Sequence, residues 1–230
     1  MTLHFGDAFV NLMPQLLSSL LVVLQITLFG FSLALVVGFA IALGRLSKSK
    51  VLRGILVVIV EFFRGTPLLV QCFYIYFVFP VLFKMVGLDN IRITAVTAGV
   101  IGFGLNYGCY MSEVIRSAIL SVDHGQMEAG LALGYKKSQV MAKFIIPPAV
   151  RNSIPVFGNY LITMVKDTSI LASISVAEML LVTKNYAGRT FQTVESYTIL
   201  ALMYLVISLP LSRLVSLLER KLGKSEKGHC

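Results

Sequence analysis

Charged residues are scarce in this chain of 230 residues, and tryptophan is absent from it. Asp, Glu, Lys and Arg together make up 13% of the sequence, whereas hydrophobic residues make up 57%. A soluble domain carries about 25% charged residues, so this composition excludes an ordinary soluble globule and indicates a membrane protein. The formal net charge of +9 does not indicate a nucleic-acid partner, because Lys and Arg in a membrane chain chiefly fix its topology.

Cysteine and histidine are equally sparse, with three of each and no shared spacing. The sequence therefore offers neither a disulfide framework nor a set of metal ligands. It also has no G-x-x-x-x-G-K-[S/T] phosphate loop and no nucleophile with a base and an orienting group. We expect no metal site, no cofactor in this chain and no catalytic residues, which favours a membrane path over an enzyme.

Long apolar runs, by contrast, recur along the whole chain. Each is long enough to cross about 30 Å of hydrocarbon as a helix. We predict an all-α, polytopic membrane protein that forms a single domain over residues 1–230. Its five transmembrane helices are expected at approximately 16–43, 54–83, 94–120, 154–181 and 197–218.

The basic residues are distributed unequally between the two sides of these segments. The loop after the first segment, the 116–151 region and the C-terminal tail together hold fourteen Lys and Arg residues. The loops near 84–92 and 184–189, on the other side, hold four. Because cytoplasmic loops carry the excess of Lys and Arg, the N-terminus is predicted to lie outside and the C-terminus in the cytoplasm.

The second apolar segment is interrupted by polar residues and by Pro67. Proline lacks the backbone N–H that a helix needs, and Gly65 weakens the turn before it, so a helix break with a restart is predicted here. A restart leaves free backbone donors, which suit a carboxylate ligand. The alternative is a simple proline kink with Glu61 and Arg64 paired one turn apart.

Lys166 and Asp167 form a second polar island, about 18 Å into the fourth segment and therefore near the middle of the bilayer. Adjacent residues on a helix point about 100° apart, so these two charges cannot simply neutralise each other. Asp167 either faces a ligand or pairs with another helix, and Arg64 is the candidate partner.

The third segment contributes a polar stripe. Asn106 and Tyr110 lie one helical turn apart, and Glu113 continues the same face. Asn106 and Tyr110 are candidates for a pocket inside the membrane. Glu113 either joins them or pairs with Arg116 near the cytoplasmic end of the segment.

The region 123–147 lies between two apolar segments yet carries several charges, so it must face water. Residues 126–133 have a helical composition, Gly134 permits a sharp turn, and residues 136–145 are helical in composition again. The proline pair at 147–148 is predicted to end the second helix. The result is a helix-turn-helix at the membrane surface; the alternative is an amphipathic loop that lies on lipid headgroups.

This region resembles the EAA loop of ABC importer permeases, written as E-A-A, three residues, Gly, nine residues and I-x-L-P. Glu128-Ala129, Gly134 and Pro147 fall at matching positions, and the departures are Gly130, Phe144 and Ile146. In that family the loop is a coupling helix that docks onto a cytoplasmic ATPase. The resemblance therefore implies an ATPase-coupling role for Glu128, Ala129, Gly130, Gly134, Tyr135 and Pro147.

Three further stretches resemble the polar amino-acid branch of that family, which serves histidine, glutamine, arginine or cystine. They are FRGTPLLVQ at 63–71, YGCYMSEVIR at 107–116 and VKDTSI at 165–170. In family members that hold an amino acid within the membrane, the first stretch lines the pocket. Together with the polar residues of the third and fourth segments, the candidate substrate-binding set is Thr66, Leu68, Gln71, Asn106, Tyr110, Glu113, Asp167 and Ser169.

The resemblance implies a permease subunit of an ATP-driven amino-acid importer in the bacterial inner membrane. Its implied partners are a second permease subunit, identical or homologous, and a cytoplasmic ATPase dimer that holds ATP and Mg²⁺. An extracytoplasmic binding protein would deliver the amino acid. The alternative is an ion-coupled carrier or channel that works without an ATPase and uses Lys166 and Asp167 as coupling sites.

Overall fold

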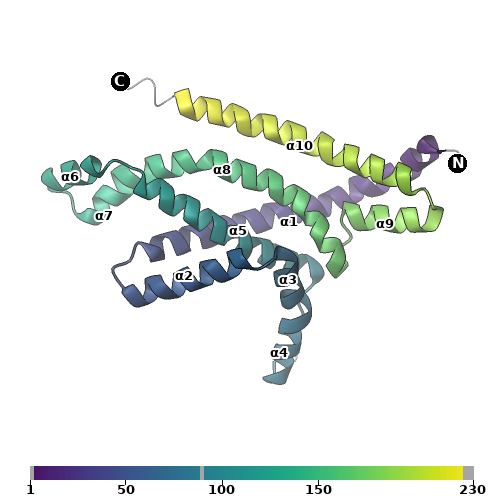
Figure 1. Cartoon of the computed structure of the whole chain (residues 1–230), viewed down its shortest axis with the longest axis horizontal. Coiled ribbons are helices and arrows are strands. Elements are labelled where there is room, and N and C mark those ends of the chain that lie inside the picture. The colour runs from purple at the N-terminus through teal and green to yellow at the C-terminus, as the bar shows by residue number, and fades with distance from the viewer. Residues whose placement is uncertain (1–2, 89–90, 225–230) are drawn as a thin grey trace.

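The computed structural model describes residues 3–88 and 91–224, and this part of the chain is almost entirely helical, with no strand (Figure 1). The predicted all-α fold class is confirmed. In chain order the elements are α1 (Phe5–Arg45), α2 (Lys50–Gly65), α3 (Leu68–Phe73), the π-helical turn η1 (Tyr74–Val78), α4 (Phe79–Met85), α5 (Ala95–Leu120), α6 (His124–Ala132), α7 (Lys137–Val140), the π-helical turn η2 (Met141–Ile145), α8 (Ile146–Asp167), the 3-10 helix η3 (Thr168–Ile174), α9 (Met179–Thr190) and α10 (Thr193–Lys224).

The long helices α1, α5, α8 and α10 extend along the long axis of the molecule, and α3 and α4 project from its side (Figure 1). The N-terminus and α9 lie at one end of this axis. The short helices α6 and α7 lie at the other end, together with the C-terminal end of α10 (Figure 1). The predicted helix-turn-helix is therefore at the end opposite the N-terminus.

Helices α1 and α5 approach closely because each presents glycine to the other. A Cβ atom added to Gly38 of α1 would lie 3.0 Å from Cβ of Met111 and 3.1 Å from the carbonyl oxygen of Gly108. A Cβ atom added to Gly108 of α5 would lie 2.8 Å from a methyl group of Val37. The close contact holds α5 firmly against α1, so α5 can serve as a fixed wall for side chains on its other faces.

The predicted break in the second apolar segment is present in the structure. Helix α2 ends at Gly65, Thr66 and Pro67 adopt extended backbone angles, and α3 restarts the helix at Leu68. The chain changes direction at this point (Figure 1). The segment 54–83 is therefore divided between α2 and the α3–η1–α4 run.

The expected helix over 154–181 is not continuous. Helix α8 ends at Asp167, η3 follows, and Ser175 adopts a left-handed backbone with φ of 64°. The sequence did not reveal this interruption, because the whole stretch is apolar and hydrophobicity alone does not distinguish a turn buried in the protein from a helix. The stretch 184–189, expected to be a loop, lies within α9.

A buried carboxylate starts α9. The side chain of Glu178 is fully buried and accepts hydrogen bonds from the backbone N–H groups of Leu180 at 2.8 Å and Leu181 at 2.7 Å. The Tyr204 hydroxyl of α10 donates to the same carboxylate at 3.3 Å. This cap satisfies the free donors of the first turn of α9 and ties α9 to α10.

The prediction that the proline pair at 147–148 ends a helix is wrong. Helices α7 and α8 are joined through η2 into one helical run from Lys137 to Asp167, with the prolines in the first turn of α8. In η2 the N–H of Ile146 bonds to the carbonyl of Met141, five residues back. A widened turn before the prolines accommodates their rings and missing donors, so the helix continues.

By length and composition, three helices in the described residues are apolar and long enough to cross a membrane, namely Phe5–Arg45, Leu68–Met85 and Thr193–Lys221. Helices α5 and α8 are also long, at 26 and 22 residues, but more polar. They carry the polar residues that the sequence singled out.

Candidate functional site

Polar side chains from α2, α5 and α8 meet around a pocket of about 460 Å³ beside the break between α2 and α3. The pocket brings together five of the residues expected to bind substrate, which are Thr66, Leu68, Asn106, Tyr110 and Asp167. Residues that are far apart in the sequence thus form one site. Its size suits a small polar molecule rather than a polymer.

Asp167 is the acidic group of this pocket. The hydroxyl of Tyr107, which is buried in α5, donates to Oδ2 of Asp167 at 2.6 Å. Asp167 therefore pairs with Tyr107 and not with Arg64, the partner considered from the sequence. In the part of the chain that the structure describes, Oδ1 of Asp167 has no hydrogen-bond partner, so it can accept a donor from a ligand.

A buried amide pair, Gln71 and Asn106, connects the pocket wall to the helix break. The side chain of Gln71 donates to the carbonyl of Phe63 at 2.8 Å and to Oγ1 of Thr66 at 2.8 Å. Asn106 donates to the side-chain oxygen of Gln71 at 3.1 Å and to the Phe63 carbonyl at 3.1 Å. The pair satisfies a carbonyl freed by the end of α2 and fixes the helix break to α5.

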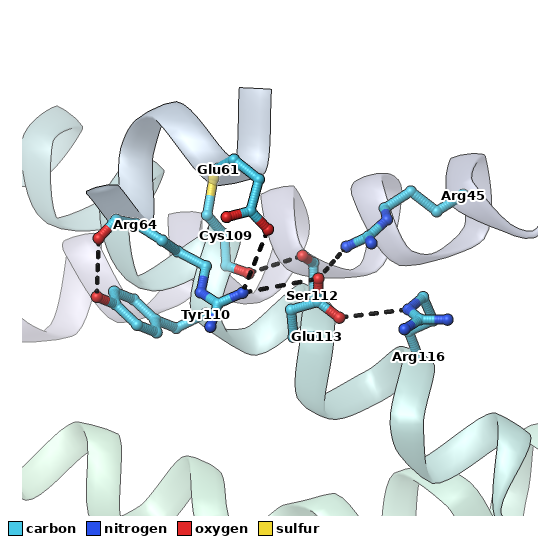
Figure 2. A network of polar contacts seen from close by, with 8 residues as sticks. All are labelled: Arg45, Glu61, Arg64, Cys109, Tyr110, Ser112, Glu113 and Arg116. Carbon is cyan, nitrogen blue, oxygen red and sulfur yellow. Dashed lines mark hydrogen bonds and ion pairs between the residues drawn. The ribbon is translucent and has the colours of Figure 1, made fainter. Parts of the chain in front are cut away.

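Next to the pocket, Glu113 is the centre of an ion-pair cluster that joins α1, α2 and α5 (Figure 2). Arg45 of α1 pairs with one oxygen of its carboxylate, and Arg116 donates to the other at 3.3 Å. Arg64 lies 3.8 Å from both Glu113 and Glu61. Both alternatives raised by the sequence, the pairs Glu61–Arg64 and Glu113–Arg116, are thus present.

Three of the expected substrate-binding residues do not line the pocket. Gln71 lies behind the pocket wall, Glu113 belongs to the ion-pair cluster, and Ser169 lies on η3. Arg64, which the sequence raised as a partner of Glu61 or Asp167, also lines the pocket. Sequence reasoning overlooked three further residues that line it, namely Tyr107, Tyr160 and Thr163. The spacing of Tyr160, Thr163 and Asp167 follows one face of a helix and could have revealed two of them.

The helix-turn-helix has the sharp bend that the sequence predicted. Gly134 has φ of 83°, which only glycine adopts at little cost. The N–H of Tyr135 bonds to the carbonyl of Gly130 at 3.1 Å, and the N–H of Gly134 bonds to that of Leu131 at 3.0 Å. These two bonds form a Schellman motif, which ends α6 and reverses the chain.

Gly130, a departure from the EAA pattern, has a structural reason. A Cβ atom at this position would lie 2.7 Å from a methyl group of the buried Val140, so only glycine allows α6 and α7 to pack this closely. Tyr135 completes the packing, since its ring contacts Phe144 edge-on and Lys143 lies 5.2 Å above it. The departure therefore keeps the two helices together.

The outer face of the helix-turn-helix is open. Glu128, Ala129 and Pro147 are exposed, and the side chains of Leu131 and Leu133 are 47% and 76% exposed. Beneath it, a second pocket of about 510 Å³ is lined mainly by Leu, Ile, Val and Met side chains. Leu131 and Leu133 thus form an exposed apolar surface beside Glu128.

The chain thus combines long apolar helices, a polar pocket between helices and exposed helices at one end, and the known proteins that it resembles are transport subunits. Residues 34–224 match the family described as "Binding-protein-dependent transport system inner membrane component". The chain is 36% identical over 215 residues to "Probable amino-acid permease protein YxeN" of Bacillus subtilis, covering 94% of each chain. It is 34% identical to "Glutamine transport system permease protein GlnP" of Escherichia coli, covering 91% of this chain and 93% of GlnP.

A solved structure agrees with these relatives. The chain superimposes with a TM-score of 0.86 on a protein titled "Crystal structure of an amino acid ABC transporter with histidines", at 34% identity, covering 96% of this chain and 100% of the other. The chain therefore belongs to the inner-membrane permease subunits of binding-protein-dependent ABC importers, in the polar amino-acid branch. The resemblance found in the motifs is confirmed.

Proposed function

We propose that this chain forms, with a second permease subunit, the translocation path of an amino-acid importer and couples it to ATP hydrolysis. The pocket offers a carboxylate, hydroxyl groups and tyrosine rings, which suit the ammonium and side chain of an amino acid. Thr66, Leu68, Asn106, Tyr110 and Asp167 would contact it directly. Gln71, Glu113 and Ser169, the other candidates, would support the site from behind or beside it.

One observation carries this proposal: both arms of the helix-turn-helix lead directly into the pocket. On one side, α5 bears Asn106, Tyr107 and Tyr110, and only three residues separate its end from the start of α6. On the other side, the unbroken run from α7 through α8 ends at Asp167. A displacement of the surface helices would therefore be transmitted to both walls of the pocket.

The proposed assembly is the one that membership of the family implies. Two cytoplasmic ATPase subunits would hold ATP and Mg²⁺ and bind Glu128, Ala129, Gly130, Gly134, Tyr135 and Pro147. An extracytoplasmic binding protein would deliver the amino acid. The whole chain, 1–230, would act as a single transmembrane domain with five spans in the bacterial inner membrane, its N-terminus outside and its coupling segment and C-terminus in the cytoplasm.

The coupling role can be tested at Gly134. Gly134→Leu places a side chain where φ is 83° and should abolish ATP-dependent uptake and substrate-stimulated ATP hydrolysis, while the subunit still inserts. Gly87→Leu is the matched control, because Gly87 has the same φ of 83° and equally open surroundings but lies far from the surface helices. Glu128→Trp provides a second test without backbone strain.

Two outcomes would contradict the proposal. Normal ATP-dependent uptake by both Gly134→Leu and Glu128→Trp would remove the coupling assignment. Uptake by the purified chain in liposomes, driven by a proton or sodium gradient without any ATPase, would favour the ion-coupled carrier considered from the sequence. Both measurements use radiolabelled L-glutamine, L-arginine, L-histidine and L-cystine.

A further inference from the structure

Arg64 lies where the pocket meets the ion-pair cluster, and the sequence offered it only as an ion-pair partner of Glu61 or Asp167. We propose that Arg64 binds the α-carboxylate of the transported amino acid and that Glu61 and Glu113 hold its guanidinium while the pocket is empty. The inference rests on the proposed amino-acid transport and deepens it. It means that the site selects ligands with a free carboxylate next to an ammonium group.

The position of Arg64 meets the first requirement, which is access to the pocket. Arg64 is in the last turn of α2 and is one of the residues around the pocket. Its guanidinium carbon lies 5.4 Å from the centre of the Tyr110 ring, and the Tyr110 hydroxyl donates to its carbonyl at 3.5 Å. Figure 2 shows one guanidinium nitrogen directed toward the two carboxylates and another directed away from them.

The charges of the cluster meet the second requirement, which is that Arg64 can be released. Three guanidinium groups, of Arg45, Arg64 and Arg116, face only two carboxylates, so one positive charge is not compensated within the cluster. Glu113 is already engaged by Arg45 and Arg116. The contacts of Arg64, both at 3.8 Å, are longer than hydrogen bonds, which makes it the least firmly held of the three.

The solvent exposure of these groups also indicates that Arg64 can be released from the carboxylates. The side chains of Arg64 and Arg116 are 37% and 35% exposed, whereas that of Arg45 is 10% exposed, so Arg45 is the firmly buried member of the cluster. A partly exposed ion pair at 3.8 Å contributes little to stability, because water screens it. An incoming carboxylate that forms two parallel hydrogen bonds with the guanidinium would therefore displace the contacts to Glu61 and Glu113 at little cost.

Asp167 supplies the opposite charge. It belongs to the same pocket as Arg64 but comes from α8, and its Oδ1 atom is open to a donor. An amino acid carries its carboxylate and its ammonium on one carbon, so a cation and an anion around one small pocket match it. Tyr107 donates to Asp167, and the Tyr110 ring lies against the Arg64 guanidinium, so tyrosines of α5 contact both charged groups.

Equilibrium binding tests the inference without requiring ATP hydrolysis. The complex of permease and ATPase subunits is purified, and binding of tritiated L-arginine, L-histidine and L-glutamine is measured in competition with the α-carboxamide of each. The wild type should prefer the acid over the amide by about 10- to 100-fold, as a charge-assisted hydrogen bond implies. Arg64→Gln should reduce this preference to within about 3-fold.

Arg116→Gln is the matched control. It removes another arginine from Glu113 but does not touch the pocket, so the preference for the acid should persist. Arg64→Lys keeps the charge beside Glu61 and Glu113 but loses the two-pronged donor, and it should retain part of the preference. If the complex with Arg64→Gln does not assemble, the preference of the Arg64→Lys complex for the acid over the amide decides the question.

Three results would overturn the inference. They are an unchanged acid-to-amide ratio in Arg64→Gln and Arg64→Lys, an equal loss in Arg64→Gln and Arg116→Gln, and no measurable binding of any of the three amino acids to the wild type. A failure of the proposed function would look different, because the complex would then bind amino acids with this preference but show no ATP-dependent uptake.

Discussion

At the scale of single residues, ligand binding in the pocket depends on Asp167, whose carboxylate has one oxygen bonded to the protein and one oxygen without a protein partner among the described residues. Tyr107 donates to one oxygen of Asp167 and leaves the other open. The tyrosine is 5% exposed, so it orients the carboxylate from the protein interior. The partner of Asp167 is thus a neutral hydroxyl and not a protein cation, and the second carboxylate oxygen remains available to a ligand.

Asp167→Asn should weaken binding of the transported amino acid about 10-fold or more, because the amide still accepts from Tyr107 but no longer carries the charge that attracts an ammonium group. Equilibrium binding to the purified complex measures the effect. Tyr107→Phe serves as the control, since it removes the hydrogen bond but keeps the charge, and it should cost less. Equal affinities of Asp167→Asn and the wild type would show that Asp167 is only structural.

Asp167 and Glu113 could be predicted as site candidates from the sequence, because ionisable residues are rare in apolar segments. Their partners were harder to predict. The sequence could not tell whether Asp167 meets Arg64 or another group, because that depends on how α2, α5 and α8 are rotated against one another. Tyr107 and Tyr160 were overlooked because tyrosine is compatible with an apolar helix, and only their shared pocket identifies them.

At the scale of elements, the break between α2 and α3 is stable because Gln71 spans it. Its amide donates to Phe63 and Thr66 on one side of the break, and Asn106 of α5 donates to its oxygen. The sequence showed the break through Pro67, since proline has a local effect on the backbone. It could not show the bridge, which needs the three-dimensional approach of α5.

Gln71→Leu should destabilise the complex by about 1–3 kcal/mol, because it removes the buried hydrogen bonds that Gln71 makes to Phe63, Thr66 and Asn106. Thermal melting of the purified complex, alone and with bound amino acid, measures the change. Val70→Ala, on the exposed side of the same helix, is the control and should alter melting little. A variant with unchanged melting but weaker amino-acid binding would instead place Gln71 in contact with the ligand.

Helix boundaries near prolines and turns show why sequence rules fail at this scale. The π-helical turn η2 lets the helix continue through the proline pair at 147–148, and no residue type in 141–145 predicts such a turn. The left-handed backbone at Ser175 likewise interrupts an apolar run without glycine or proline. In both places tertiary packing, including the buried cap at Glu178, overrides the local preference.

At the scale of the whole molecule, the basic regions of the sequence gather at one end. The loop between α1 and α2, the surface helices α6 and α7, and the end of α10 lie at the end opposite the N-terminus (Figure 1). The distribution of Lys and Arg in the sequence predicts that these regions share one side of the membrane. The long helices between them carry the pocket, so the basic end and the N-terminal end are separated by the length of the bundle.

This arrangement predicts which end faces the cytoplasm. In a variant whose three cysteines are replaced by serine, single substitutions Ser47→Cys, Ser138→Cys and Asn185→Cys place a thiol in the α1–α2 loop, on α7 and on α9. The last two sites are exposed in the subunit. A membrane-impermeant maleimide added to intact spheroplasts should label only Asn185→Cys, and all three should react after permeabilisation. If Ser138→Cys is labelled from outside while Asn185→Cys is protected, the orientation is reversed. The surface helices would then have no access to cytoplasmic ATPase subunits.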